Sequence, residues 1–143
     1  MALSRETTDR SSPRMPATKR SFAAEPISLG DVRSFIRERA EGAALYGRDT
    51  DDLVQAVSEV CANAIQHADG DSFIVSWSGG PQRPTEVKIR DQGVFAAQGL
   101  VFSGRSRGLG LPLVAALVDE LSIVRGTPTR PGTTVRLVKY RDT

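Results

Sequence analysis

The sequence is short of the residues on which several large classes of protein depend. Its 143 residues include one cysteine and one histidine. A single cysteine excludes an internal disulfide framework. No internal repeat is visible along the chain, so nothing in it indicates an array of small stacked units. Because 39% of the residues are hydrophobic, a chain of this length can bury one core of ordinary size, and we expect one domain.

Long apolar runs are also missing, above all from the amino-terminal segment. Residues 1–21 read MALSRETTDRSSPRMPATKRS, with no stretch that resembles a signal peptide or a membrane span. We therefore expect a cytoplasmic protein that does not engage a membrane. The segment is rich in Ser, Thr, Arg and Pro and lacks apolar periodicity, which predicts a disordered tail over residues 1–19 and a globular domain over residues 20–143.

No strong charge of one sign marks the chain. Its formal net charge is +2, and the sequence pI of about 9.0 reflects a small excess of scattered arginines. No basic run is interleaved with aromatic residues. Direct binding to nucleic acid therefore has little support from the sequence.

What the chain does have is a clear succession of helical and strand periods. Apolar residues recur with helical spacing in three segments and alternate with polar residues in others. The predicted helices cover residues 28–45, 47–70 and 108–121, and we expect Gly42 to weaken or end the first of them. The predicted strands cover residues 20–26, 72–80, 85–93, 122–126 and 133–140. This order favours an α/β sandwich, with a mostly antiparallel sheet covered on one face by helices, over a Rossmann βαβ layout.

The second predicted helix carries two separate stripes. Its apolar face is formed by Leu53, Val57, Val60, Cys61 and Ala64. Glu59, Asn63 and His67 recur at every fourth position and form a polar stripe about a third of a turn away. A solvated helix face produces the same pattern without any function, so the stripe is weak evidence alone. Cys61 is most simply a small core residue rather than a nucleophile or a metal ligand.

Two glycine motifs follow further along the chain. Asp91 lies at the end of a predicted strand in RDQGVF, and Gly93 would let the backbone approach a ligand closely, although turns use the same residues. In GRSRGLGLPLV, Gly108 and Gly110 precede a helix whose first N–H groups can bind an anion, and Arg105 adds positive charge. Such glycines also serve simple packing, so this motif is only moderately specific.

The last motif is PGTTVRLV, in which Thr133 opens the final predicted strand. Threonines there are commonest as strand formers. The order of all four motifs is more informative than any one of them: Glu-x-x-x-Asn on a helix, Asp-x-Gly after a strand, Gly-x-Gly before a helix, and Gly-Thr at a late strand. Together they resemble the ATP-binding core of the GHKL superfamily, which has the Bergerat fold, over about residues 20–140.

Within that superfamily, the small size and the form GRSRGLGLPLVAALVDEL followed by GTTVRLV look most like the bacterial anti-sigma-factor serine kinases. Two features depart from the superfamily pattern. Phe95 stands where a second glycine is common, and the segment 94–107 is short for an ATP lid. No helix bearing a phosphoacceptor histidine precedes the domain, which argues against a histidine kinase.

The resemblance implies a role for each matching residue. Glu59 would be the general base, and Asn63 would be the ligand of Mg²⁺. Asp91 would accept a hydrogen bond from the adenine amino group. The supporting ATP contacts would come from Gly93 against the base, Thr133 beside Asp91, the amides of Gly108 and Gly110 on the phosphates, and Arg105 with Arg107 as candidate phosphate contacts.

The function implied by the resemblance is an anti-sigma factor that uses ATP and Mg²⁺. It would sequester a sigma factor and phosphorylate a serine of a STAS-type anti-anti-sigma partner, as a serine/threonine-protein kinase. A homodimer stays open. Two alternatives also stay open at this point: a non-catalytic nucleotide-binding anti-sigma or interaction module, and an ATPase module of a larger sensor system.

Overall fold

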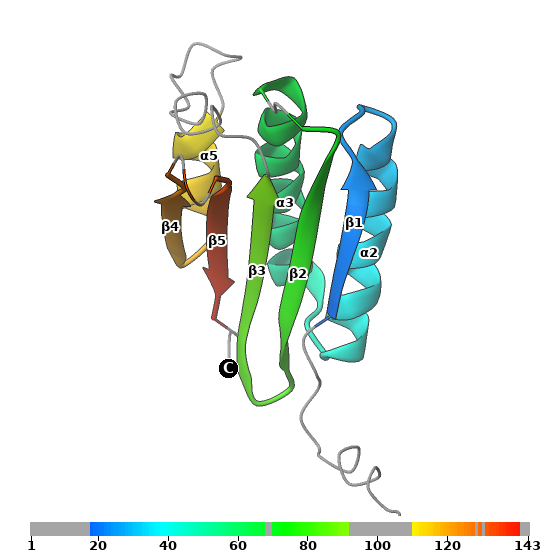
Figure 1. Ribbon diagram of the computed structural model, residues 1–143. Coiled ribbons are helices and arrows are strands. Elements are labelled where there is room, and N and C mark those ends of the chain that lie inside the picture. Colours follow the sequence, from blue (N-terminus) through cyan, green and yellow to red (C-terminus); the bar gives the residue numbers. More distant parts are fainter. Residues whose placement is uncertain (1–17, 68–69, 92–109, 128, 130, 141–143) are drawn as a thin grey trace, which may run out of the picture.

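The computed structural model describes residues 18–67, 70–91, 110–127, 129 and 131–140. All structural statements concern these ranges. Figure 1 shows a sheet with helices packed on one face. The elements are β1 (Thr18–Ala23), α2 (Ser28–Gly42), α3 (Gly47–His67), β2 (Ser72–Gly80), β3 (Arg83–Asp91), α5 (Gly110–Leu117), β4 (Glu120–Arg125) and β5 (Thr133–Lys139).

The five strands form one sheet in the order β1-β2-β3-β5-β4. Every neighbouring pair in it is antiparallel. Helices α2, α3 and α5 cover one face, and no helix of the described residues lies on the other, which we call the open face (Figure 1). The predicted α/β sandwich with an antiparallel sheet is confirmed. None of the helices in the described ranges has both the length and the apolar character that crossing a membrane requires.

The core lies between the sheet and the helices, where the sequence periods place it. Alternate residues of β2 point toward the helices, and Phe73, Val75 and Trp77 are fully buried there. Every member of the predicted apolar face of α3 is buried, including Cys61. Burial raises the pKa of the Cys61 thiol, because the thiolate would lose its hydration. These properties agree with a core role for the cysteine.

Strand β1 begins at Thr18 rather than at Arg20, the start predicted for this strand, and Thr18 pairs in register with Trp77. The strand also ends at Ala23, before Pro26. Of its six residues, TKRSFA, only Phe22 is buried, and so short a segment gives no usable period. Pairing with β2, a tertiary effect, sets its limits.

Two helices end before the limits of their helical periods. Helix α2 ends at Gly42, the residue expected to weaken or end it, because Ala44 adopts a left-handed conformation (φ 60°) and the Leu45 N–H donates to the Ala40 carbonyl. Helix α5 ends at Leu117 instead of residue 121, since the Asp119 N–H already bonds to β5.

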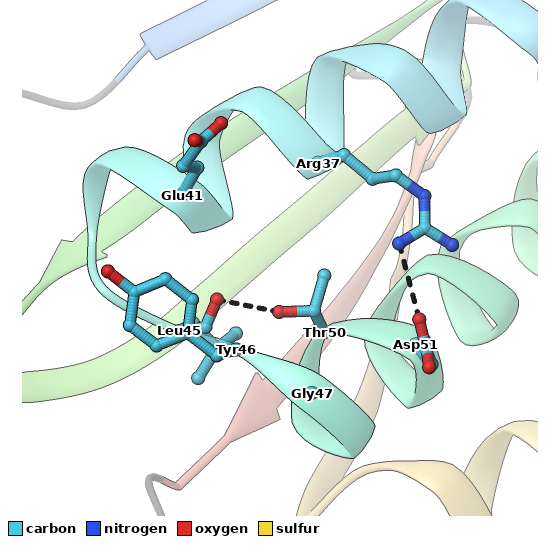
Figure 2. A pocket seen from close by; sticks show the side chains of 7 residues that line it. All are labelled: Arg37, Glu41, Leu45, Tyr46, Gly47, Thr50 and Asp51. Carbon is cyan, nitrogen blue, oxygen red and sulfur yellow. Dashed lines mark hydrogen bonds and ion pairs between the residues drawn. The ribbon is translucent and has the colours of Figure 1, made fainter.

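An open pocket lies where α2, its connection to α3 and the first turn of α3 meet (Figure 2). Two side-chain contacts hold these segments together. The Thr50 hydroxyl donates to the Leu45 carbonyl at 2.7 Å. Arg37 on α2 lies 3.2 Å from Asp51 on α3. Both members of this ion pair are more than half exposed, so its contribution to stability is small. The two contacts join the first turn of α3 to α2 and to the connection between them.

Phe22 is the residue that attaches β1 to the core. Its ring stacks on Phe73 and meets the edge of Phe35, with Arg20 above it. We expect Phe22→Ala to lower the free energy of unfolding by about 3–5 kcal/mol, because the substitution leaves a cavity between sheet and helix. Chemical denaturation measures this. Ser21→Ala, at the exposed neighbouring position, is the control and should change little; equal effects would contradict the packing role.

Candidate functional site

The carboxyl-terminal half of α3 supplies two of the predicted site residues. Glu59 and Asn63 are one helical turn apart, so they lie on the same side of the helix. Glu59 is partly exposed, whereas Asn63 is buried at 7% exposure. The Nδ2 atom of Asn63 has no hydrogen-bond partner within the described chain. A buried amide donor is normally paired, so this group suits a ligand that offers a hydrogen-bond acceptor.

The end of β3 and the start of β5 bring together two more of the predicted site residues. Asp91 is the last residue of β3 and pairs with Thr133, the first residue of β5, while Phe73 of β2 lies opposite on its other side. Directly opposed residues have Cβ atoms about 4.5–5.5 Å apart, so the carboxyl and hydroxyl groups are neighbours. Asp91 is 3% exposed and Thr133 1%. The Thr133 hydroxyl has no hydrogen-bond partner in the part of the chain described.

Gly132 determines how closely β5 approaches Asp91. Its φ is +115°, and a Cβ atom built on it would lie 3.0 Å from the carbonyl oxygen of Asp91. Only glycine combines that conformation with so little space. The sequence motif drew attention to Gly-Thr as a pair, but the need for glycine in front of Thr133 depends on a contact with a distant strand.

Helix α5 contributes its amino terminus to the same region. It begins at Gly110 and packs against α3 and β4.

The other end of α5 is held by Lys139 of β5. Its ammonium group donates to the Leu117 carbonyl at 2.9 Å and lies 3.4 Å from Asp52 of α3, so one largely buried ammonium group joins three elements. This bond also satisfies a carbonyl at the last turn of α5.

Four structural features therefore meet at one end of the sheet: the end of α3, the end of β3, the start of β5 and the start of α5 (Figure 1). Of the predicted residues, Asn63, Asp91, Thr133 and Gly110 belong to this end, with Glu59 one turn below. The described residues do not include four predicted site residues, Gly93, Arg105, Arg107 and Gly108, and the roles of these four stay predictions.

The chemistry of this end suits a nucleotide. It offers a buried carboxylate and hydroxyl for a base edge, and the first N–H groups of a helix for phosphate. The described residues contain no group of three or more His, Cys, Asp or Glu side chains that could hold a metal ion. Mg²⁺ bound with a nucleotide takes most of its ligands from phosphate and water, so a single amide oxygen such as that of Asn63 fits it.

Comparison with known proteins now identifies the family. Residues 22–139 match the family described as histidine kinase-like ATPase domain. The chain belongs to this family. The match spans every element from the end of β1 to the end of β5, and it confirms the resemblance inferred from the four motifs.

The chain is also similar to named members of the family. It is 29% identical over 133 residues to the serine-protein kinase RsbW of Bacillus velezensis, covering 82% of this chain and 81% of that protein. The serine-protein kinase RsbW of Bacillus pumilus is 29% identical over 136 residues, with the same coverage.

Two solved structures share the fold. The structure of the RsbU and RsbW domains of a Mycobacterium tuberculosis protein superposes with a TM-score of 0.69 at 23% identity, over 89% of this chain and 33% of that one. The SiaB-SiaC complex from Pseudomonas aeruginosa gives a TM-score of 0.63 at 14% identity, over 93% of this chain and 94% of the other.

The geometry at Gly132 predicts opposite effects for two glycine substitutions. Gly132→Ala should lower the free energy of unfolding by about 1–2 kcal/mol, because alanine is strained at this φ and meets the Asp91 carbonyl. Gly30→Ala on α2 should raise it by about 0.5 kcal/mol, since nothing lies within 4 Å of the new methyl group. Thermal and urea unfolding of both variants measure the difference. A stable Gly132→Ala protein would show that β5 does not need this close approach.

Proposed function

We propose that this protein is an ATP-dependent serine kinase and anti-sigma factor of the cytoplasm. It sequesters a sigma factor and phosphorylates a serine of a STAS-type anti-anti-sigma protein. The observation that carries the proposal is the buried pair of Asp91 and Thr133 at the same end of the sheet as Asn63 and the start of α5. The similarity to two RsbW serine-protein kinases over 82% of the chain supports the choice of reaction.

Adenine recognition is assigned to Asp91 and Thr133. The Asp91 carboxylate accepts a hydrogen bond from the exocyclic amino group of adenine, which guanine lacks at that edge. The Thr133 hydroxyl can donate to or accept from the base. Because both side chains are almost completely buried, each hydrogen bond forms in an environment where an unpaired group is costly, and the pocket discriminates between bases.

The phosphates lie between α3 and the start of α5. The N–H groups at Gly110 bind phosphate oxygens, and the amide oxygen of Asn63 would hold Mg²⁺. When bound, Mg²⁺ neutralises charge that develops on the transferred phosphoryl group. The Gly108 amide and the Arg105 guanidinium are proposed as further phosphate contacts.

Glu59 is the proposed general base. It is one turn from Asn63 and partly exposed, so a serine side chain of a protein partner can reach it. Glu59 takes the proton of the serine hydroxyl while the serine oxygen bonds to the γ-phosphorus. The bond from that phosphorus to the bridging oxygen breaks at the same time, and ADP leaves with the electron pair.

The adenine assignment predicts selective loss of ATP binding in Asp91→Asn. The amide can present a donor toward the adenine amino group, and the charge-assisted acceptor is lost, so ATP affinity should fall by roughly tenfold or more. Isothermal titration with Mg·ATP and Mg·GTP measures both affinities. Equal wild-type affinities for the two nucleotides, or an unchanged Asp91→Asn protein, would refute the pocket.

The base assignment predicts that binding and chemistry separate in Glu59→Ala. Mg·ATP affinity should be retained, while phosphate transfer to the partner serine falls by roughly 10²-fold or more. The assay uses labelled ATP and a STAS-domain protein recovered from the native cell on the immobilised protein. Gln55→Ala, one turn earlier on the same helix and exposed, is the matched control.

The outcomes of this assay separate the proposed kinase from its alternatives. A wild-type protein that binds ATP but never labels the partner would be a non-catalytic nucleotide-binding module. A Glu59→Ala protein that transfers phosphate as fast as wild type would keep the kinase and remove Glu59 from its mechanism.

A further inference from the structure

Arg90 directly precedes Asp91 on β3, but the two side chains lie on opposite faces of the sheet, because successive residues of a strand alternate. Asp91 faces the helices, and Arg90 is exposed on the open face, where it pairs with Thr134. From that side its Nη2 atom donates to the carbonyl of Pro131 at 3.3 Å. Arg90 therefore holds the turn that leads into β5 without lying in the pocket.

The guanidinium also occupies the space that a side chain at position 132 would fill. A Cβ atom on Gly132 would lie 3.1 Å from Nη2 of Arg90, and 3.0 Å from the carbonyl oxygen of Asp91. Gly132 is thus confined between the backbone of β3 and the Arg90 side chain. The next residue along the chain is Thr133, whose hydroxyl has no partner within the described fold.

The first residue of a strand frays easily, because it has no strand residue before it to share the ladder. Pro131 adds to this, since its nitrogen cannot donate to a neighbouring strand. The hydrogen bond that Arg90 donates to the Pro131 carbonyl instead ties this residue to β3 through its acceptor. The contact acts two residues before Thr133, where small shifts would change the separation between the Thr133 hydroxyl and the Asp91 carboxylate.

We infer that Arg90 is a positioning residue for adenine recognition, which fixes the Pro131–Gly132 turn and so keeps Thr133 beside Asp91. The inference rests on the proposed adenine contacts of Asp91 and Thr133. Arg90 acts from the open face of the sheet and touches no part of the nucleotide. Its effect is therefore on the base-binding side of the pocket, and not on the phosphate-binding side at the start of α5.

Lys88 provides a matched control. It lies two residues earlier on β3, on the same open face, and is likewise an exposed cation. It forms no ion pair in the described part of the chain, and it pairs in register with Arg136, well inside β5. Removing the charge of Lys88 tests whether the loss of any cation from this face changes ATP affinity.

The experiment compares full-length wild type, Arg90→Ala, Lys88→Ala and Asp91→Asn. Affinities for Mg·ATP and Mg·GTP are measured by displacement of a fluorescent ATP analogue, and thermal unfolding is followed for each variant. We expect Arg90→Ala to lose roughly tenfold in ATP affinity and a similar factor in the ratio of ATP to GTP affinity, as for one lost hydrogen bond to the base. Lys88→Ala should match wild type in both.

Three results would overturn the inference. In the first, Arg90→Ala binds ATP as wild type does. In the second, Arg90→Ala loses ATP and GTP affinity by the same factor and has a lower melting temperature, which would be a purely structural effect. In either case, a weakened Asp91→Asn protein would leave the proposed function intact. If Asp91→Asn also bound ATP normally, the pocket itself would be wrong, and the role of Arg90 with it.

Discussion

The register between β3 and β5 is the constraint on which the site depends. Val87 and Ile89 of β3 lie opposite Leu137 and Val135 of β5, and all four are buried against the helices. A slip of one residue would turn these side chains to the open face and expose the core, so the register is strongly specified. The same alternation turns Asp91 toward the helices. Hydrophobic burial in the middle of the sheet thus places a carboxylate at its end.

Helix α3 reaches this end because its apolar face is long and continuous. Cys61 and Ala64 continue the buried face on both sides of Asn63 in the sequence, so the polar amide is carried to the rim of the core rather than to solvent. Glu59 lies on the same side of the helix but is less covered. One helix therefore presents a buried amide and a partly exposed carboxylate one turn apart.

Local patterns predicted the helices, the strands and the motifs, because periods of 3.6 and 2 residues express which faces are buried. They also placed Asn63, Asp91 and Thr133 on elements that meet. They could not set the start of β1, which depends on pairing with β2, nor the need for glycine at 132, which depends on the backbone of β3. The contact from Arg90 to Pro131 spans 41 positions, and no local pattern encodes such a distance.

The strand order has a consequence for synthesis of the protein. Strand β5 follows all the other strands in the chain, yet it is inserted between β3 and β4 and supplies Thr133. While the ribosome still holds β5, the nascent domain can form the hairpin of β2 and β3 and pack α2 and α3 on it, but β3 lacks one neighbour. On the proposed assignment of Asp91 and Thr133 to adenine, a translating chain would be unable to bind ATP until β5 has left the exit tunnel.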